Sequence, residues 1–417
     1  MGFEFYEERD FKDTELGPLP VDWGVVRLGD IVETRKGKKP KFMTEDCISG
    51  YYPYLTAESF RTKKPKQFCL PSENEILVSA DDIVFIWDGS NAGEVFTGLS
   101  GVLASTMVKI SPYNENVISK QMLFYYLKTK FSLFNQNVVG STIPHVNKKL
   151  FFDLPIPLPP LEEQKAIAEV LRSVQLAIEK TEEVIRATKE LKKSMMKHLF
   201  TYGYVPVDET DKVKLKETEI GFIPEHWEVV RLGEVAEIFD KKRVPLNEQQ
   251  RKHRRGAYPY CGANGIIDYI EAYIFDGEYV LLAEDGGFYK RFESSAYIMR
   301  GRFWANNHVH ILQAKQNSNN YFLLYYLIYE DISRYVAGTT RQKLTQENMK
   351  KIPIPLPPLE EQKAIAEVLR AIDEKLQKEE EYKKALQNLF KSLLHHLMSG
   401  KIRVRKTQDG QNLQSED

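Results

Sequence analysis

Apolar or small residues recur at alternating steps of four and three along two long stretches of the chain. Each stretch begins directly after Leu-Pro-Pro, and two glutamates follow within three residues. Proline suits the first turn of a helix, and acidic side chains there stabilise its positive end. The spacing, sustained over about five heptads, is typical of a coiled coil. The first seam comprises Ile167, Leu171, Val174, Ile178, Thr181, Ile185, Thr188, Met195 and Leu199; the second comprises Ile365, Leu369, Ile372, Leu376, Leu386, Phe390, Leu393 and Leu397, with Glu379 and Lys383 interrupting.

The first of these helices is expected to run from Pro160 to Phe200, which at about 1.5 Å per residue gives about 60 Å. Gly203 and Gly400 stand where the two helices should end. A core helix of a single globular domain is rarely so long. We therefore expect the two seams to cover each other in an antiparallel pair.

The chain also repeats itself. Eighteen residues, PIPLPPLEEQKAIAEVLR, occur at Pro155–Arg172 and again at Pro353–Arg370. Other matches keep the same order, so the chain is a tandem duplication of a unit of about 200 residues, a variable block followed by a constant one. The further matches are Glu15–Asp30 with Glu219–Glu234, Tyr52–Tyr54 with Tyr258–Tyr260, Met122–Leu127 with Phe322–Leu327, and Gly140–Thr142 with Gly338–Thr340.

Short apolar runs between Gly, Asn, Asp and Pro predict strands in both variable blocks. The runs are 75–78, 83–87 and 106–110 in the first block and 279–282, 296–299 and 308–312 in the second, and each block closes with a helix around its Tyr-Tyr pair. The predicted fold class is α+β: two β-rich domains joined by two long antiparallel coiled-coil helices with pseudo-twofold symmetry. The expected divisions are a first domain at 1–154, a helix and linker at 155–205, a second domain at 206–352, a second helix at 353–405 and a polar tail at 406–417.

Composition narrows the class of protein. Of the 417 residues, 42% are hydrophobic and 28% charged, and the three cysteines have no paired spacing. Neither a disulfide framework nor a cysteine-based metal site is indicated. No apolar run is long enough to span a bilayer, and the acidic start does not read as a signal peptide. We expect a cytoplasmic protein with no membrane contact.

Basic residues gather in the loops of both variable blocks. Residues 24–150 hold 16 Lys and Arg against 12 Asp and Glu, and residues 228–352 hold 18 against 15. Matching basic loops in both halves indicate phosphate contact, and nearby polar side chains are suited to base edges, although a solvated loop or a cap is the alternative for each residue. The DNA-binding candidates are Lys36, Lys38, Lys39, Lys41, Arg61, Lys63, Lys64, Ser141, Thr142, His145, Lys242, Arg243, Arg251, Arg254, Arg255, Lys290, Arg291, Asn306, Asn307, His308, Thr339, Arg341 and Gln342.

Motifs for catalysis are missing from the sequence. There is no phosphate-binding G-x-x-x-x-G-K-[ST] loop and no zinc spacing. Pro159-Pro160 lacks the flanking residues of an adenine methyltransferase loop. The acid pairs Asp81-Asp82 and Glu284-Asp285 are more typical of turns than of a metal-dependent nuclease. We expect no catalytic residue and no metal site in this chain.

The motifs together resemble those of the specificity subunits of type I restriction–modification systems. The resemblance covers residues 13–405 and includes both copies of IPLPPLEEQKAIAEVLR, the opening E-[LI]-G-x-[LI]-P-x-x-W-x-V-V-R-L-G, and the ending Met398–Arg403. It implies two target-recognition domains, each reading one half of an asymmetric bipartite DNA sequence, with the helices setting the gap between the halves.

The resemblance also implies partners: two modification (methyltransferase) subunits and, through them, two restriction/translocase subunits. S-adenosylmethionine, ATP and Mg would belong to these partners, with no cofactor in this chain. The alternatives are a self-contained DNA methyltransferase or nuclease, and a coiled-coil scaffold with no DNA role. The expected docking residues are Pro160, Leu161, Glu162, Glu163 and Gln164 and their repeats Pro358, Leu359, Glu360, Glu361 and Gln362.

Overall fold

The computed structural model describes residues 2–338 and 342–407. The chain forms two compact units, unit 1 from residues 1–180 and 383–417 and unit 2 from residues 181–382. The division cuts both long helices, α6 (Leu161–Tyr202) and α11 (Leu359–Met398). Unit 1 therefore holds the first part of α6 and the last part of α11, and unit 2 holds the remainder of each.

The two predicted helices are confirmed. The seam residues are buried or half-buried along both helices. Each helix ends before a glycine in the left-handed region, Gly203 with φ +82° and Gly400 with φ +68°, a conformation that glycine adopts without strain. No helix within residues 2–338 and 342–407 has the length and apolar content needed to cross a membrane.

In each unit the start of one long helix shares a core with the end of the other, so the two segments are antiparallel there. Ile167 and Leu171 of α6 lie in the unit 1 core with Leu397 of α11. In unit 2, Leu199 and Phe200 of α6 pack with Ile365 and Leu369 of α11. Ion pairs from Lys192 Nζ to Asp373 Oδ1 (2.6 Å) and from Lys189 Nζ to Glu380 Oε1 (2.9 Å) flank this packing in unit 2.

Outside the long helices, the described residues of unit 1 form two four-stranded sheets and five short helices. The first sheet has the order β10-β9-β12-β5 and the second the order β7-β6-β11-β8. The strands are β5 (Val32–Lys36), β6 (Tyr52–Leu55), β7 (Phe68–Cys69), β8 (Leu77–Val78), β9 (Ile83–Ile86), β10 (Val95–Phe96), β11 (Gly101–Leu103) and β12 (Met107–Pro112); the helices are α1 (Leu28–Ile31), α2 (Ala57–Thr62), α3 (Lys120–Thr129), α4 (Phe131–Gln136) and α5 (Lys148–Phe152).

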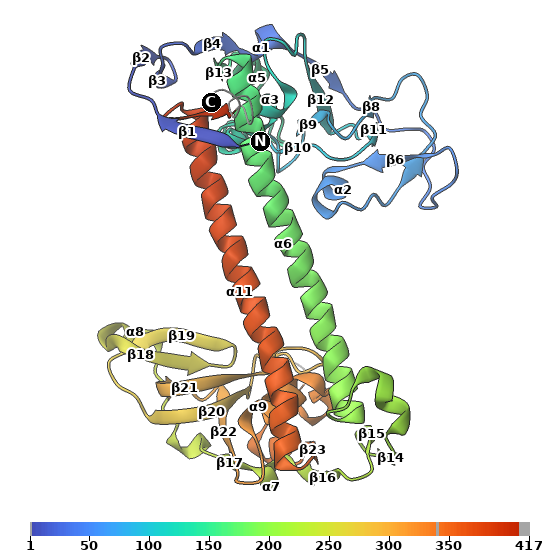
Figure 1. Ribbon diagram of the computed structural model, residues 1–417, viewed down its shortest axis with the longest axis vertical. Coiled ribbons are helices and arrows are strands. Elements are labelled where there is room, and N and C mark those ends of the chain that lie inside the picture. The colour runs from blue at the N-terminus through green and yellow to red at the C-terminus, as the bar shows by residue number, and fades with distance from the viewer. Residues whose placement is uncertain (1, 339–341, 408–417) are drawn as a thin grey trace, which may run out of the picture. The chain divides into compact units, whose positions relative to one another are not determined.

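Two-stranded ladders complete unit 1 around the start of α6. β4 (Gly24–Arg27) pairs with β13 (Pro155–Leu158), and β2 (Phe11–Thr14) pairs with β3 (Gly17–Pro20). The chain ends also meet here, because β1 (Phe3–Glu7) pairs antiparallel with β24 (Ile402–Lys406), as Figure 1 shows beside the N and C labels. Unit 1 is thus closed by its first and last strands.

Unit 2 repeats this plan with one large sheet in place of two. Its six strands follow the order β17-β22-β20-β21-β18-β19 (Figure 1). The elements that flank the sheet follow the chain order of their unit 1 counterparts at both ends, with β14, β15, β16 and α7 before it and α9, α10 and β23 after it, whereas α8 precedes β18 and α2 of unit 1 follows β6. The sheet strands are β17 (Ala236–Ile238), β18 (Arg255–Gly262), β19 (Gly265–Ile270), β20 (Phe275–Ala283), β21 (Ala296–Ala305) and β22 (Val309–Ala314); the others are η1 (Val207–Lys212), β14 (Leu215–Thr218), β15 (Gly221–Pro224), β16 (Glu228–Arg231), α7 (Leu232–Val235), η2 (Asp240–Lys242), α8 (Glu248–His253), α9 (Asn320–Tyr329), η3 (Ser333–Tyr335), α10 (Gln346–Lys350) and β23 (Pro353–Leu356).

The repeated Tyr-Pro-Tyr motif has the same role in both units. In unit 1, Tyr54 of β6 pairs in parallel with Val102 of β11. In unit 2, Tyr260 of β18 pairs in parallel with Trp304 of β21. All six predicted runs overlap strands, although only residues 77–78 of the run 75–78 are in one, and the Tyr-Tyr segments form α3 and α9. The predicted α+β fold class is therefore correct.

Candidate nucleic-acid interface

In unit 1 a loop of Gly140–Pro144 is held at its base by one carboxylate. His145 forms bridges with both Val139 and Asp88, which closes the loop. The Asp88 carboxylate accepts from His145 Nδ1 at 2.6 Å and pairs with Lys36 Nζ of β5 at 2.7 Å. Two predicted DNA-binding residues, Lys36 and His145, therefore converge on Asp88, while Ser141 and Thr142 lie exposed on the loop.

Unit 2 builds the same loop base from different side chains. Lys343 forms bridges with Ala337 and Asp285, as His145 does in unit 1. Asp285 accepts from His308 Nδ1 at 2.6 Å, and Lys343 Nζ pairs with Glu284 Oε1 at 2.8 Å. Of the predicted residues on this loop, Gln342 is exposed, whereas Thr339 and Arg341 lie outside the described residues.

A hollow of about 510 Å³ lies beside this loop base in unit 2 and gathers four predicted residues: Arg251, Asn306, Asn307 and His308. Asn306 is buried, and its Oδ1 accepts from His308 N at 2.8 Å, so it positions His308. Exposed amide and imidazole groups of this kind can donate to and accept from base edges. The hollow therefore has the chemistry for base reading.

Arg243, also predicted to bind DNA, lies in a buried ionic network. Its guanidinium pairs with Glu284, donates to Val309 O at 2.8 Å and lies 3.5 Å from Asp240 Oδ2. Only 13% of the side chain is exposed. The side chain is committed to the core of unit 2 because its charge offsets two buried carboxylates. We therefore correct its assignment from phosphate contact to support of the loop base.

Asp240, Glu284 and His310 of this network have a spacing that could hold a metal ion. His310 Nδ1 lies 2.6 Å from Asp240 Oδ2, and its Nε2 lies 2.7 Å from Leu344 O. A metal-binding imidazole needs a ring nitrogen with a lone pair directed at the ion. Here both nitrogens already face acceptor oxygens, so the cluster fits an ion-paired support better than a metal centre.

Burial and ionic contacts shift the pKa values of Asp240 and Glu284 in opposite directions. Burial raises the pKa of Asp240, but the hydrogen bond and charge of His310, the Ile311 N–H and the charge of Arg243 together outweigh it, so the pKa lies below its ordinary value. Burial likewise raises the pKa of Glu284, and hydrogen bonds from Lys343 and Arg243 lower it overall. Both groups are therefore held as carboxylates beneath the loop.

The other predicted cations divide by whether they have an acidic partner. Arg61 pairs with Glu94, Arg251 with Asp268 (3.2 Å), Arg254 with Glu271 (2.8 Å) and Arg291 with Glu330 (3.7 Å). The rest are exposed and form no ion pair within residues 2–338 and 342–407, so they are available to phosphates: Lys38, Lys39, Lys41, Lys63, Lys64, Lys242, Arg255 and Lys290. DNA contact by any of these cations stays a prediction.

Four of the expected docking residues are used inside the chain. Glu163 Oε2 accepts from Trp23 Nε1 at 3.2 Å, and its repeat Glu361 accepts from Trp227 Nε1 at 3.1 Å. Gln164 is 1% exposed, and its amide bonds Ser119 N, Val117 O and Pro159 O, each at 2.9 Å.

The repeat of Gln164, Gln362, is fully buried and bonds Asn319 N (3.0 Å), Asn317 O (3.1 Å) and Pro357 O (2.9 Å). These glutamates and glutamines therefore fasten each helix start to its own unit, which corrects their assignment to docking. The docking residues that stay exposed or half-exposed are Pro160, Leu161 and Glu162, their repeats Pro358, Leu359 and Glu360, and Glu361.

Asp88 is a functional candidate that the sequence patterns did not single out, and Asp285 is one that they named only as part of an acid pair typical of turns. Each anchors the base of its loop, and each is followed by a glycine with positive φ, Gly89 or Gly286. The signal was present, because an Asp-Gly pair occurs in both halves 197 positions apart, one fewer than the 198 that separate the eighteen-residue repeats. It was hidden by the divergence of the neighbouring residues.

Comparisons with known proteins agree on one family. The family model described as "Type I restriction modification DNA specificity domain" matches residues 20–187 and 224–388. The type I restriction enzyme MjaVIII specificity subunit of Methanocaldococcus jannaschii is 36% identical over 96% of this chain and 98% of that protein. The putative MjaX specificity subunit of the same organism is 30% identical over 96% and 99%. The crystal structure of a type I restriction–modification S subunit from M. genitalium matches with a TM-score of 0.65 at 16% identity, covering 90% of this chain and 96% of that one.

Proposed function

The chain belongs to the family of type I restriction–modification DNA specificity subunits, and we propose that it reads an asymmetric bipartite DNA target as the non-catalytic subunit of its complex. Each unit contributes one target-recognition domain. The two loop bases differ, with Lys36 and His145 on Asp88 in one and His308 on Asp285 in the other. Different side chains present different donors and acceptors, so the two half-sites should differ in sequence.

The observation that carries the proposal is the duplication itself. Both halves match the specificity-domain model, and each half supplies one long helix and one basic, β-rich block. Two readers joined by long helices suit two half-sites with an unread gap, since one turn of DNA is about 34 Å and the helices are about 60 Å long. We infer that the helices set the length of that gap.

The proposal assigns the chemistry to partners. Two methyltransferase subunits would dock on the exposed parts of the repeated helix starts, Pro160–Glu162 and Pro358–Glu360, and two restriction subunits would join through them. S-adenosylmethionine, ATP and Mg would then be held by those partners. The identical sequence of both helix starts supports docking of two copies of one partner.

Genome-wide mapping of methylated adenines, with and without this gene, tests the function. The expected result is one two-part motif with a fixed gap that disappears when the gene is deleted. An unchanged methylation map would contradict the proposal. Incubating the purified chain alone with labelled S-adenosylmethionine and DNA tests the non-catalytic role, and incorporation of label would overturn that role.

A further inference from the structure

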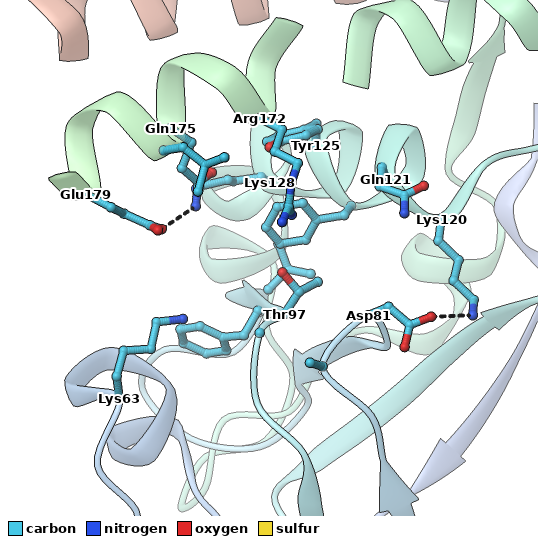
Figure 2. Close-up of a pocket in the computed structure, with 16 residues that line it drawn as sticks. Lys63, Asp81, Thr97, Lys120, Gln121, Tyr125, Lys128, Arg172, Gln175 and Glu179 are labelled. Atoms are coloured by element: carbon cyan, nitrogen blue, oxygen red, sulfur yellow. Dashed lines mark hydrogen bonds and ion pairs between the residues drawn. The ribbon is translucent and has the colours of Figure 1, made fainter. Parts of the chain in front are cut away.

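Unit 1 has a pocket of about 520 Å³ that the loop sites do not use. Its walls come from α3, from the segment around β10, from the residue that follows α2, and from α6 between Arg172 and Glu179. Figure 2 shows Arg172 and Gln175 extending from the helical wall and Lys63 reaching in from the opposite wall. Its volume lies in the range of small-molecule sites, about 300 to 1,000 Å³.

Three cations face this pocket with no acidic partner. Lys63, Lys128 and Arg172 form no ion pair within the described residues, whereas Lys120, also on the wall, pairs with Asp81 at 3.2 Å. Burial lowers the pKa of Lys128, and the charge of Lys63 lowers it further, although Glu179 partly opposes this. Like charges directed into one space are stabilised by an anion bound between them.

Other groups on the wall suit the remaining parts of a nucleotide. Phe96, Phe124 and Tyr125 offer aromatic surface, on which bases and sugars pack. The Oε1 of Gln175 is buried and has no hydrogen-bond partner among the described residues, while its Nε2 donates to Glu179 Oε1 at 3.2 Å. An unpaired buried acceptor is costly and is satisfied by a hydroxyl or amino group of a ligand.

Unit 2 can be compared with unit 1 at this position, because the arginine of unit 2 that corresponds to Arg172 has an acidic partner. Arg370, the repeat of Arg172, pairs with Glu374 at 3.1 Å, whereas the residue four positions after Arg172 is Leu176. Asp373 stands where unit 1 has Gln175, and it accepts from Tyr325 OH at 2.9 Å and from Lys192 Nζ at 2.6 Å. The uncompensated charge is thus a property of unit 1.

We propose that the pocket of unit 1 binds a phosphate group carried by a nucleotide, through Lys63, Lys128 and Arg172. The phosphate belongs either to the DNA backbone, in which case the inference rests on the proposed function, or to a free nucleotide. Gly98 leaves room for this arrangement, because a Cβ there would lie 3.2 Å from Lys63 Nζ.

Leu176→Glu tests the pocket with little risk to folding, since Leu176 is 41% exposed. It gives Arg172 the carboxylate that Arg370 has in unit 2, and Leu176→Gln is the matched neutral control. Two probes are titrated into the full chain: dAMP by calorimetry, and a duplex carrying the methylated motif by fluorescence anisotropy at several salt concentrations. A second variant, Lys128→Gln with Arg172→Gln, removes the charges instead.

If the pocket binds a backbone phosphate of DNA, Leu176→Glu and the double variant should each bind the duplex about tenfold more weakly. The salt slope of binding should fall by about 0.9 for each phosphate that the protein no longer neutralises. A free nucleotide predicts loss of dAMP binding with duplex binding unchanged. The inference is overturned if neither probe responds, or if Arg370→Gln in unit 2 has the same effect as the unit 1 variants. If the wild-type chain did not bind the motif duplex more tightly than other duplexes, that result would count against the proposed function alone. The dAMP titration would still test whether the pocket binds a nucleotide.

Discussion

Arg403 and Glu163, 240 positions apart in the chain, form a buried two-point ion pair in unit 1. The guanidinium Nε lies 2.6 Å from Oε1, and its second terminal nitrogen lies 2.7 Å from Oε2. Arg403 also pairs with Asp22 and Glu8, and only 7% of its side chain is exposed. One residue of the last strand therefore ties together the chain start, the first ladders and the start of α6.

Replacing Arg403 by alanine should destabilise unit 1 strongly. The change leaves Glu163 buried without its cation, a loss of about 3 to 5 kcal/mol in the free energy of unfolding. Arg405→Ala is the matched control, because Arg405 pairs with Glu4 on the surface, and solvent-exposed pairs contribute little to stability. Urea unfolding, together with hydrogen exchange measured in β1 and β24, compares the two variants. Equal losses of stability would contradict the structural role of Arg403.

Acid should weaken the loop base of unit 2. The folded-state pKa values of Asp240 and Glu284 lie below the ordinary values of 3.8 and 4.5. These carboxylates therefore stabilise the fold at neutral pH, and the stabilisation is lost as pH falls below those ordinary values towards the folded ones. Hydrogen exchange in β22 measured from pH 7 to pH 3 should show this loss.

Asp240→Asn is the control for that acid response. It removes the titrating carboxylate, so β22 should be less protected at pH 7 but should change less on acidification. A variant that responds to acid as strongly as the wild-type chain would show that another group is responsible.

Exposed cations and the buried Arg243 should differ in how their loss affects DNA binding. Lys39→Ala and Lys41→Ala should weaken binding to all duplexes by the same factor and lower the salt slope by about one each. Arg243→Ala should instead destabilise unit 2, since it leaves Glu284 and Asp240 short of a buried cation. Thermal melting and anisotropy on the same samples separate the two effects. Loss of a sequence preference in either lysine variant would show base reading instead of phosphate contact.

Shortening both long helices should shorten the gap in the DNA target. Removing Thr181–Ala187 from α6 and Glu379–Ala385 from α11 takes one heptad from each seam and keeps its phase. The change is about 10 Å, or about three base pairs at about 3.4 Å each. Methylation mapping should show the same two half-sites with a gap about three base pairs shorter. Altered half-sites at an unchanged gap would refute the role of the helices in spacing.

The sequence was most informative where periodicity and repetition reinforced each other. The seam, the glycine stops at Gly203 and Gly400 and the strands of both blocks follow from local spacing, and the structure has them where they were expected. The duplication also aligned Tyr54 with Tyr260, which lie in equivalent parallel strand pairs. Local patterns of this kind do not depend on distant contacts.

Long-range partners were the part that the sequence could not supply. Glu163 and Gln164 were predicted to dock a partner, yet both are buried and accept hydrogen bonds from Trp23 and Ser119. Arg243 was predicted to be a surface cation, yet its partners are Glu284, directly after β20, and Val309 of β22. The strand patterns also did not show how the strands assemble into sheets. Unit 1 has two four-stranded sheets, whereas unit 2 has one six-stranded sheet. Each of these outcomes depends on which segments meet, and spacing along one segment does not contain that information.

The pairing of β1 with β24 has a consequence for biosynthesis. Unit 2 is one continuous segment, 181–382, whereas unit 1 needs residues from 383 onward, including Leu397 and Val404 of its core. On the ribosome, unit 2 can be completed while unit 1 still waits for its final helix turns and strand. At about 5 to 20 residues per second, the first 180 residues wait on the order of 10 to 40 seconds with an unfinished core. The half of the protein that is translated first is the half that matures last, so chaperone dependence should fall on the N-terminal half.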